Sequence, residues 1–207
     1  ILLKGFSPEE AASLLWKKRS REETLNYQLV FGGVPKYLEQ INLNQSFNQN
    51  MNRLCFSPHG IMLKEVERIF YSQFREPRTY RKIINLLRNG IFSLSEISAK
   101  TRIASGGGLK QYLKNLERAE MIRSFVPFYR SGDSKLKKYT LADEFLVFFF
   151  KYIEPNLRII KESSSRRLFE TLTQNSFDIW LGFAFEQFCL KHAGLLALVI
   201  DFADDLL

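Results

Sequence analysis

Several polar side chains that could contact nucleic acid fall on one face of a predicted helix after residue 108. Apolar residues at helical spacing indicate this helix, and they are Leu109, Tyr112, Leu113, Leu116 and Met121. The positions this pattern leaves exposed are Lys110, Gln111, Lys114, Asn115 and Arg118. Lysine and arginine bond phosphates, whereas glutamine and asparagine bond base edges. The face therefore predicts a DNA contact, and a protein-docking surface and an ordinary solvated face are its alternatives.

Basic residues also follow the helix, in two β-prone runs that cover residues 123–130 and 136–141. The residues between these runs, Ser131-Gly132-Asp133-Ser134, are typical of a hairpin turn. The basic side chains of this hairpin that could reach phosphates beside a groove are Arg130, Lys135, Lys137 and Lys138. Gly106-Gly107-Gly108 before the helix could let backbone N–H groups approach a phosphate, or could simply form a flexible turn.

Two further helices must position this face. Residues 80–87 carry an apolar stripe that ends at Asn89-Gly90, and Ser95-Glu96-Ile97-Ser98 opens a short helix with Ile97 directed inward. Three helices followed by a hairpin is the order of a winged helix-turn-helix. We therefore predict such a module between about Pro77 and Leu141.

Other chemistry is less well supported by the sequence. A P-loop needs Gly-Lys-Ser/Thr, and Gly-Lys does not occur in the chain. Two thiols and two imidazoles could form a zinc site from Cys55, His59, Cys189 and His192, but the spacings are irregular and the apolar neighbours favour buried thiols. Carboxylates could hold Mg²⁺ in an acidic cluster of Glu186, Asp201, Asp204 and Asp205, yet no lysine follows Lys191 to complete a nuclease site.

The residues before the winged unit are predicted to be helical. Ser7-Pro8-Glu9-Glu10 combines a cap, a first-turn proline and two acids, and Ser20-Arg21-Glu22-Glu23 repeats the Ser-x-x-Glu capping box. Gly32-Gly33 ends the second helix, and Pro35 begins a short third one. Further helices are predicted up to Cys55, over residues 62–74, from Asp143 to a break at Pro155, and over residues 177–192.

Composition describes a folded protein with a basic surface. The chain has 207 residues, of which 45% are hydrophobic, and a formal net charge of +8. Residues 110–141 hold eight basic and three acidic side chains, so most of the excess charge lies there. Positive charge favours nucleic acid, acidic proteins or anionic surfaces. The longest apolar runs are too short to span a membrane, and two distant cysteines suggest a reducing compartment, so we expect a cytoplasmic protein.

Three motifs resemble a known family. They are Leu-Lys-Gly-Phe-Ser-Pro-Glu-Glu at 3–10, Phe-Gly-Gly-Val-Pro-Lys-Tyr-Leu-Glu at 31–39, and Lys-Tyr-Thr-Leu-Ala-Asp-Glu-Phe-Leu-Val-Phe-Phe-Phe-Lys-Tyr-Ile-Glu-Pro-Asn at 138–156. In this order they resemble the C-terminal half of the prokaryotic AAA-superfamily ATPases, related to the STAND class, that carry a restriction-endonuclease-like tail. The resemblance spans nearly the whole chain.

The resemblance implies three segments: residues 1–75 as the helical lid of an ATPase, residues 76–156 as the winged-helix domain, and residues 157–207 as linker helices and a partial nuclease-like domain. It places the first nuclease acid at Glu186 and a strand at Leu198-Val-Ile-Asp-Phe-Ala-Asp-Asp205. The expected catalytic aspartate then falls on Ala197, and the Glu-x-Lys that should follow is absent. We therefore expect no nuclease activity.

Taken together, these features predict a mainly α protein with a lid-like bundle, a winged helix and a partial α/β tail. Its expected function is that of the regulatory, DNA-binding part of an AAA-type ATPase. The expected partners are double-stranded DNA and an ATPase core, with no membrane. No cofactor is expected in this chain, and ATP and Mg²⁺ are implied for the parent family only. A module that docks on an ATPase core or a partner protein, and an inactive metal-dependent nuclease, are the alternatives.

Overall fold

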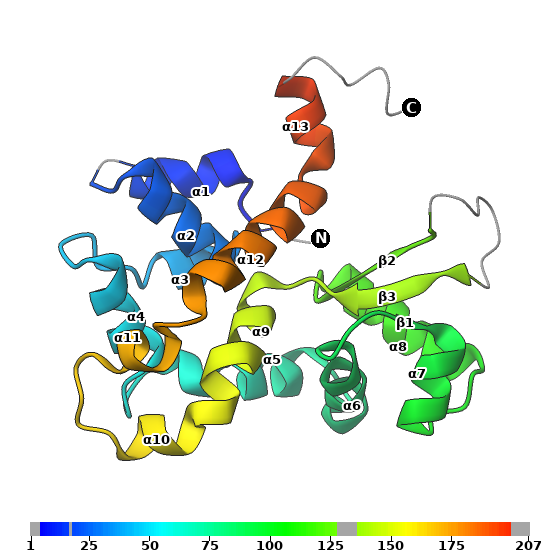
Figure 1. Cartoon of the computed structure of the whole chain (residues 1–207). Coiled ribbons are helices and arrows are strands. Elements are labelled where there is room, and N and C mark those ends of the chain that lie inside the picture. Colours follow the sequence, from blue (N-terminus) through cyan, green and yellow to red (C-terminus); the bar gives the residue numbers. More distant parts are fainter. Residues whose placement is uncertain (1–4, 17, 128–135, 200–207) are drawn as a thin grey trace. The chain divides into compact units, whose positions relative to one another are not determined.

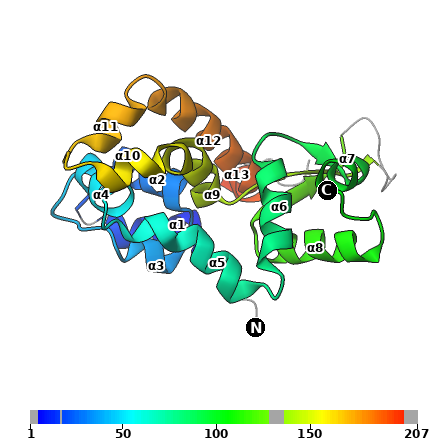
Figure 2. The same ribbon diagram turned by 90° about the horizontal axis from the view of Figure 1, so that it is seen from below.

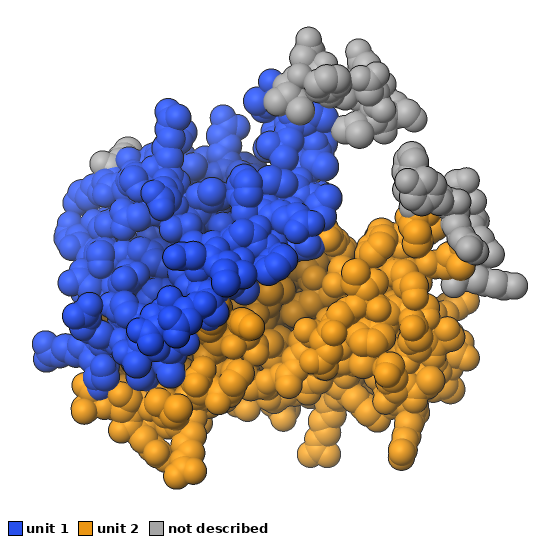
Figure 3. Space-filling model, viewed as in Figure 1, with its two compact units in different colours: residues 1–52, 165–207 blue, residues 53–164 orange. Residues whose placement is uncertain are grey.

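The computed structural model describes residues 5–16, 18–127 and 136–199. These residues form a mainly helical protein with one small antiparallel sheet, as the sequence predicted. The chain folds into two compact units, coloured in Figure 3: residues 1–52 with 165–207 form unit 1, and residues 53–164 form unit 2. The segments 1–75, 76–156 and 157–207 do not coincide with these units, because the chain returns to unit 1 after residue 164. Those segments stay a prediction.

Unit 1 is built from helices. They are α1 (Pro8–Leu15), α2 (Arg21–Phe31), α3 (Pro35–Leu38), most of α4 (Phe47–Cys55), α11 (Leu168–Thr173), α12 (Phe177–Lys191) and α13 (Ala193–Val199). The predicted cap of α1 is confirmed, since Ser7 accepts from the Glu10 backbone and Glu10 accepts from the Ser7 backbone. Ser20 caps α2, but Glu23 does not complete the second predicted box. Its carboxylate instead accepts hydrogen bonds from Arg19 and from the Phe47 backbone.

The structure requires glycine at both Gly32 and Gly33, which follow α2. Gly32 ends the helix at φ 61° and ψ −156°, a conformation that is essentially restricted to glycine. Gly33 lies against residue 6, where a Cβ atom would come within 2.1 Å of the Phe6 carbonyl oxygen. The Phe6 N–H donates to the Gly33 carbonyl at 2.7 Å, which holds the two segments together. The motif therefore joins the start of the chain to the α2–α3 connection.

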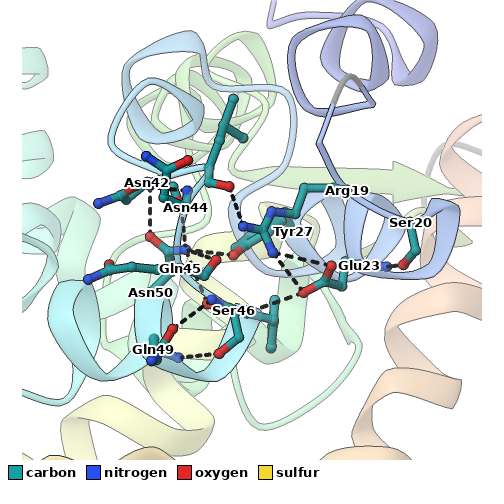
Figure 4. A network of polar contacts seen from close by, with 12 residues as sticks. Arg19, Ser20, Glu23, Tyr27, Asn42, Asn44, Gln45, Ser46, Gln49 and Asn50 are labelled. Atoms are coloured by element: carbon teal, nitrogen blue, oxygen red, sulfur yellow. Dashed lines mark hydrogen bonds and ion pairs between the residues drawn. The ribbon is translucent and has the colours of Figure 1, made fainter.

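A buried polar network fixes the loop between α3 and α4 (Figure 4). Asn50 is completely buried, and its amide nitrogen lies 2.9 Å from the Tyr27 hydroxyl and 3.0 Å from the Asn42 carbonyl. Its carbonyl oxygen accepts from the Asn42 N–H at 2.8 Å. Buried polar groups are stable only when such partners are present, so the Asn/Gln-rich stretch is an ordered loop rather than a linker.

Unit 2 contains residues 77–141, which the sequence predicted to be a winged unit. Its elements are η1 (Ile61–Lys64), α5 (Glu65–Gln73), α6 (Pro77–Leu87), β1 (Phe92–Ser93), α7 (Leu94–Thr101), α8 (Gly107–Arg118), β2 (Ile122–Phe125), β3 (Lys138–Leu141), α9 (Glu144–Phe148), the π-helical η3 (Phe149–Ile153), η4 (Glu154–Asn156) and α10 (Leu157–Glu162). Residues 62–74 were predicted as one helix. They form a 3₁₀ turn and an α-helix instead, because Lys64 at φ −102° and ψ 0° interrupts the α-helical path.

The three strands form one sheet in the order β1-β3-β2, and both pairs are antiparallel (Figure 1). The β2–β3 pairing confirms the part of each predicted β run that lies at 123–125 and at 138–141, and it places Ile122 opposite Leu141. The predicted turn at 131–134 lies outside the described residues. Strand β1 was not predicted, and it pairs Phe92 with Tyr139. The core below the sheet comes from α6, α7 and α8, through Ile83, Ile84, Leu87, Ile97, Leu109, Leu113 and Leu116.

The C-terminal part differs from the expected α/β tail. Helix α12 confirms the predicted helix at 177–192, but Leu198 and Val199 belong to α13 rather than to a strand. Their sequence, Ala-Gly-Leu-Leu-Ala-Leu-Val, combines good helix formers with a single glycine, so a helix is favoured locally. Residues 200–207 lie outside the described range. Among the described residues, no helix combines the length and the apolar character that a membrane crossing requires.

Candidate functional site

Helix α8 presents a polar face because its apolar side chains are all used in the core of unit 2. Leu109, Leu113 and Leu116 are buried, and the spacing of three to four residues turns the other side of the helix outward. The exposed residues of α8 are Gly107, Gly108, Lys110, Gln111, Lys114 and Arg118. No large apolar side chain is exposed on this helix.

The cations of this face form one row. Lys110, Lys114 and Arg118 succeed one another at every fourth position, so each is displaced by about 6 Å along the helix axis from the one before. Within the described part of the chain, none of the three forms an ion pair with a carboxylate. Three unpaired cations on a rigid helix can bind a row of phosphates, because no internal ion pair has to be broken first.

The sequence predicted that Asn115 is exposed and available to bond a base edge, but the structure shows that it is already hydrogen-bonded within the protein. It is half-buried, and its amide nitrogen donates to the Tyr80 hydroxyl at 2.6 Å. Its carbonyl oxygen accepts from the Gln111 amide nitrogen at 2.8 Å. Both polar ends of Asn115 are therefore engaged within unit 2, whereas the Gln111 side chain is exposed.

A second hydrogen bond fixes α8 against α6. The Tyr112 hydroxyl donates to the Glu76 carboxylate at 2.6 Å, and Glu76 is the residue immediately before α6. This hydrogen bond raises the pKa of the Tyr112 phenol above its ordinary value. Figure 2 shows α8 running close to the end at which α6 begins. The exposed face of α8 is thus held by two polar contacts to one neighbouring helix.

Two lysines at the start of β3 are paired with acids of unit 2. Lys138 is the first residue of the strand, and Lys137 precedes it. The Lys137 ammonium lies 3.7 Å from the Glu117 carboxylate on α8, and the Lys138 ammonium lies 3.1 Å from the Glu96 carboxylate on α7. Lys137 also lies over the Tyr139 ring, 5.6 Å from its centroid. These lysines are partly neutralised, in contrast to the cations of α8. The other two predicted wing residues, Arg130 and Lys135, lie outside the described residues.

Glu96 combines two roles. Its carboxylate accepts from the Ser93 backbone and hydroxyl at the start of α7, and it binds Lys138 of the neighbouring strand. The hydrogen bonds from Ser93, with a smaller contribution from Lys138, lower the pKa of Glu96 from its ordinary 4.5 to about 2. The carboxylate is therefore ionised at neutral pH, and it couples the cap of α7 to the sheet.

The turn between α7 and α8 is exposed and carries a further cation. Arg102 ends α7 at φ 57° and ψ 28°, a left-handed conformation that usually favours glycine or asparagine. The three glycines that follow have no described atom within 4 Å of the position a Cβ would occupy, so packing in the described part of the chain does not require glycine there. The predicted approach of a phosphate to these glycines stays a prediction.

The residues considered for metal binding do not form a centre in the described part of the chain. Within that part, no group of three or more His, Cys, Asp or Glu side chains is placed to hold a metal ion. Cys55 is completely buried, and burial raises the pKa of its thiol, which disfavours the thiolate that zinc needs. Cys189 is half-buried on α12, where Glu186 is exposed. Asp201, Asp204 and Asp205 lie outside the described residues.

Sequence reasoning missed three residues that shape this site. Tyr80 was assigned to the apolar stripe of α6, yet its hydroxyl holds Asn115. Glu96 was read only as part of the start of a short helix, and Glu117 only as one of three acids in residues 110–141, yet each binds a lysine of the predicted hairpin. Helical periodicity could not reveal these contacts, because the partners lie 20 to 42 residues apart in the chain.

Comparison with known proteins finds a relative but no activity. The chain is 32% identical over 186 residues to an uncharacterized protein of Methanocaldococcus jannaschii. The match covers 89% of this chain and 39% of that protein, so the chain spans about two fifths of its relative's length. No family model matches the chain, and no solved structure matches it. The function is therefore argued from the site.

Proposed function

We propose that residues 77–141 form a winged helix-turn-helix module that binds double-stranded DNA, with α8 in the major groove. The order of α6, α7, α8 and the β2–β3 pair is the order of elements in such modules, and β1 adds the third strand of the sheet. In modules of this kind the last helix enters the major groove, which is wide enough to admit an α-helix.

The observation that carries this proposal is the row of unpaired cations on α8. Contacts with phosphates dominate the affinity of proteins for DNA. Such contacts need cationic side chains that are open to solvent, so that each can give up its water and counterions and bind a phosphate. Lys110, Lys114 and Arg118 meet this condition, because their side chains are exposed and form no ion pair among the described residues. Gln111 lies beside the same row and supplies a group that can bond a base edge.

A protein-docking role for α8 is less well supported. A docking helix usually exposes an apolar face, since aromatic and aliphatic side chains contribute most of the binding energy of protein interfaces. The exposed positions of α8 are glycine, lysine, glutamine and arginine instead. This composition favours a charged polymer over an apolar groove as the partner.

We further propose that the chain is the regulatory part of an AAA-type ATPase. The motifs at 3–10, 31–39 and 138–156 support this assignment through the family resemblance. The matched relative has further length outside the region that this chain covers, as a protein with a separate nucleotide-binding core would have. ATP and Mg²⁺ would be bound by that core, and unit 2 would couple its state to DNA.

The salt dependence of duplex binding tests the DNA proposal. Three phosphate contacts give a slope of about −2.7 in a plot of log K against log salt, which corresponds to a loss of about 40-fold in affinity between ~50 and ~200 mM salt. The expected result is this loss, measured by fluorescence anisotropy with a labelled random-sequence duplex and the 207-residue chain.

A double variant assigns the binding to α8. Lys110→Ala with Lys114→Ala should weaken binding to all duplexes and flatten the slope by about two units. The matched control is Lys151→Ala with Lys161→Ala, which removes the same charge from two exposed lysines outside α8 and should leave the slope unchanged. If the chain shows no salt-sensitive binding, or if both double variants behave alike, the proposal is wrong.

A further inference from the structure

Three polar side chains form a relay from the core of unit 2 to the exposed face of α8. The Tyr80 hydroxyl accepts from the Asn115 amide nitrogen at 2.6 Å, and the Asn115 carbonyl oxygen accepts from the Gln111 amide nitrogen at 2.8 Å. The inner end of the relay is rigid. Tyr80 is 5% exposed, and its ring stacks on Phe74 at a centroid distance of 3.9 Å and meets the edge of Tyr112 at 5.1 Å.

The relay fixes which way the Gln111 amide points. A primary amide has one carbonyl acceptor and two N–H donors. In the structure the Asn115 nitrogen faces the Tyr80 hydroxyl and the Asn115 oxygen faces Gln111, so the nitrogen of Gln111 is the end of its amide that faces Asn115. Gln111 then keeps its carbonyl oxygen and its second N–H for a partner outside the chain.

We propose that Gln111 reads an adenine in the major groove, and that Tyr80 and Asn115 are positioning residues that hold its amide for this contact. The inference rests on the proposed DNA-binding function. Adenine presents an acceptor, N7, next to a donor, the N6 amino group, and this pair matches one N–H and one carbonyl oxygen. Guanine presents two acceptors at these places, so its O6 atom would face the carbonyl oxygen of Gln111.

The relay matters because an unheld glutamine amide can rotate by half a turn. Rotation exchanges donor and acceptor, and a side chain that populates both orientations discriminates poorly between adenine and guanine. With the amide held, the preference for adenine at one position should be about 5- to 100-fold over guanine. Without the relay, the preference should fall while the phosphate contacts of α8 remain.

The experiment selects preferred duplexes from a random pool with the 207-residue chain and then measures affinities for single-base variants of the selected site. One position should require adenine, and Gln111→Ala should remove that requirement while random-sequence duplexes keep most of their affinity. Tyr80→Phe should reduce the adenine preference at the same position, because it keeps the aromatic ring and removes only the hydroxyl that holds Asn115.

Tyr112→Phe is the matched control. It removes a hydroxyl from the neighbouring ring of the same cluster, but that hydroxyl binds Glu76 and not the relay. The adenine preference should therefore survive in Tyr112→Phe. Equal losses in the two phenylalanine variants would show a general structural effect and overturn the relay.

The outcomes separate this inference from the proposed function. Salt-sensitive duplex binding without an adenine preference that depends on Gln111, or with a preference for guanine at that position, overturns the inference and leaves the DNA-binding function intact. Absence of salt-sensitive binding to any duplex overturns both.

Discussion

The Lys137 ammonium lies 3.7 Å from the Glu117 carboxylate, so a cation of the predicted hairpin is partly neutralised by an acid on α8 itself. The same carboxylate accepts a hydrogen bond from the Ser124 hydroxyl on β2. Glu117 thus ties the strands to α8 and lowers the positive potential beside the row of exposed cations. Glu117 therefore has two effects: it stabilises the fold, and it weakens the attraction of this surface for phosphate.

Replacing Glu117 should therefore strengthen DNA binding. Glu117→Gln keeps an acceptor for Ser124 but frees Lys137, which can then contact a phosphate. We expect affinity for a random duplex to rise about two- to fivefold at ~100 mM salt and the salt slope to steepen by about one unit. Fluorescence anisotropy at several salt concentrations measures both. Glu120→Gln is the control, since Glu120 is exposed and forms no ion pair among the described residues. An equal gain in both variants would show that only net charge matters.

The pH dependence of stability should reveal the role of Glu96. Its pKa in the folded protein is about 2, below its ordinary 4.5, so its ionised form is favoured by folding. This stabilisation is fully present above about pH 4.5 and is lost as the pH falls toward 2. Glu96→Gln should accordingly lower the urea midpoint at pH 7, and the difference from the wild type should shrink between pH 4.5 and 2.5. A difference that stays constant over this range would contradict the assignment.

Two glycine-to-alanine changes should have opposite effects on stability. Gly33→Ala places a Cβ atom 2.1 Å from the Phe6 carbonyl oxygen, a backbone atom that cannot move freely, and should cost ~2 kcal/mol or more. Gly108→Ala adds a methyl group inside α8 where no neighbour lies within 4 Å, and should stabilise by ~0.5–1 kcal/mol. Urea unfolding measures both changes. A mild effect of Gly33→Ala would show that residues 5 and 6 are not held against Gly33 in solution.

Local signals in the sequence predicted several helix ends of this fold correctly. Ser7 with Glu10, Gly32 and Pro35 mark helix ends through interactions within a few residues, and the structure places the ends of α1, α2 and α3 there. The start of α7 was placed at Ser95, but the cap is Ser93. The Ser93-x-x-Glu96 box carries the same kind of local signal, so this start was readable from the sequence.

Contacts between distant segments could not be predicted in this way. Strand β1 contains only Phe92 and Ser93, and it exists because Tyr139 and Lys138 lie beside it. The exposed row of Lys110, Lys114 and Arg118 followed from helical periodicity, but the state of Asn115 did not, since Tyr80 lies 35 residues away. Periodicity identifies which side of a helix faces the core, and only the tertiary structure identifies which polar groups on its border are already satisfied.

Asn50 supplies a test of the buried network in unit 1. Its side chain is completely buried, it accepts from the Asn42 N–H, and its nitrogen lies within bonding distance of the Tyr27 hydroxyl and of the Asn42, Gln45 and Ser46 carbonyls. Asn50→Ala leaves these groups without their buried partner and should lower the free energy of unfolding by ~2–4 kcal/mol. The control is Asn48→Ala, an exposed position of the same helix, which should change it by less than ~0.5 kcal/mol.

Asn50→Asp makes the test more specific, because it keeps the acceptor for the Asn42 N–H and replaces the donor by a second acceptor. Three backbone carbonyls would then face a carboxylate oxygen in a buried place, so the ionised form is strongly disfavoured. The pKa of the new carboxyl should rise, since its protonated form can again donate to a carbonyl. The variant should accordingly be less stable than the wild type at pH 7 and recover part of the difference at about pH 4. If Asn50→Asp were as stable as the wild type at pH 7, the amide nitrogen of Asn50 could not be the donor that holds this loop.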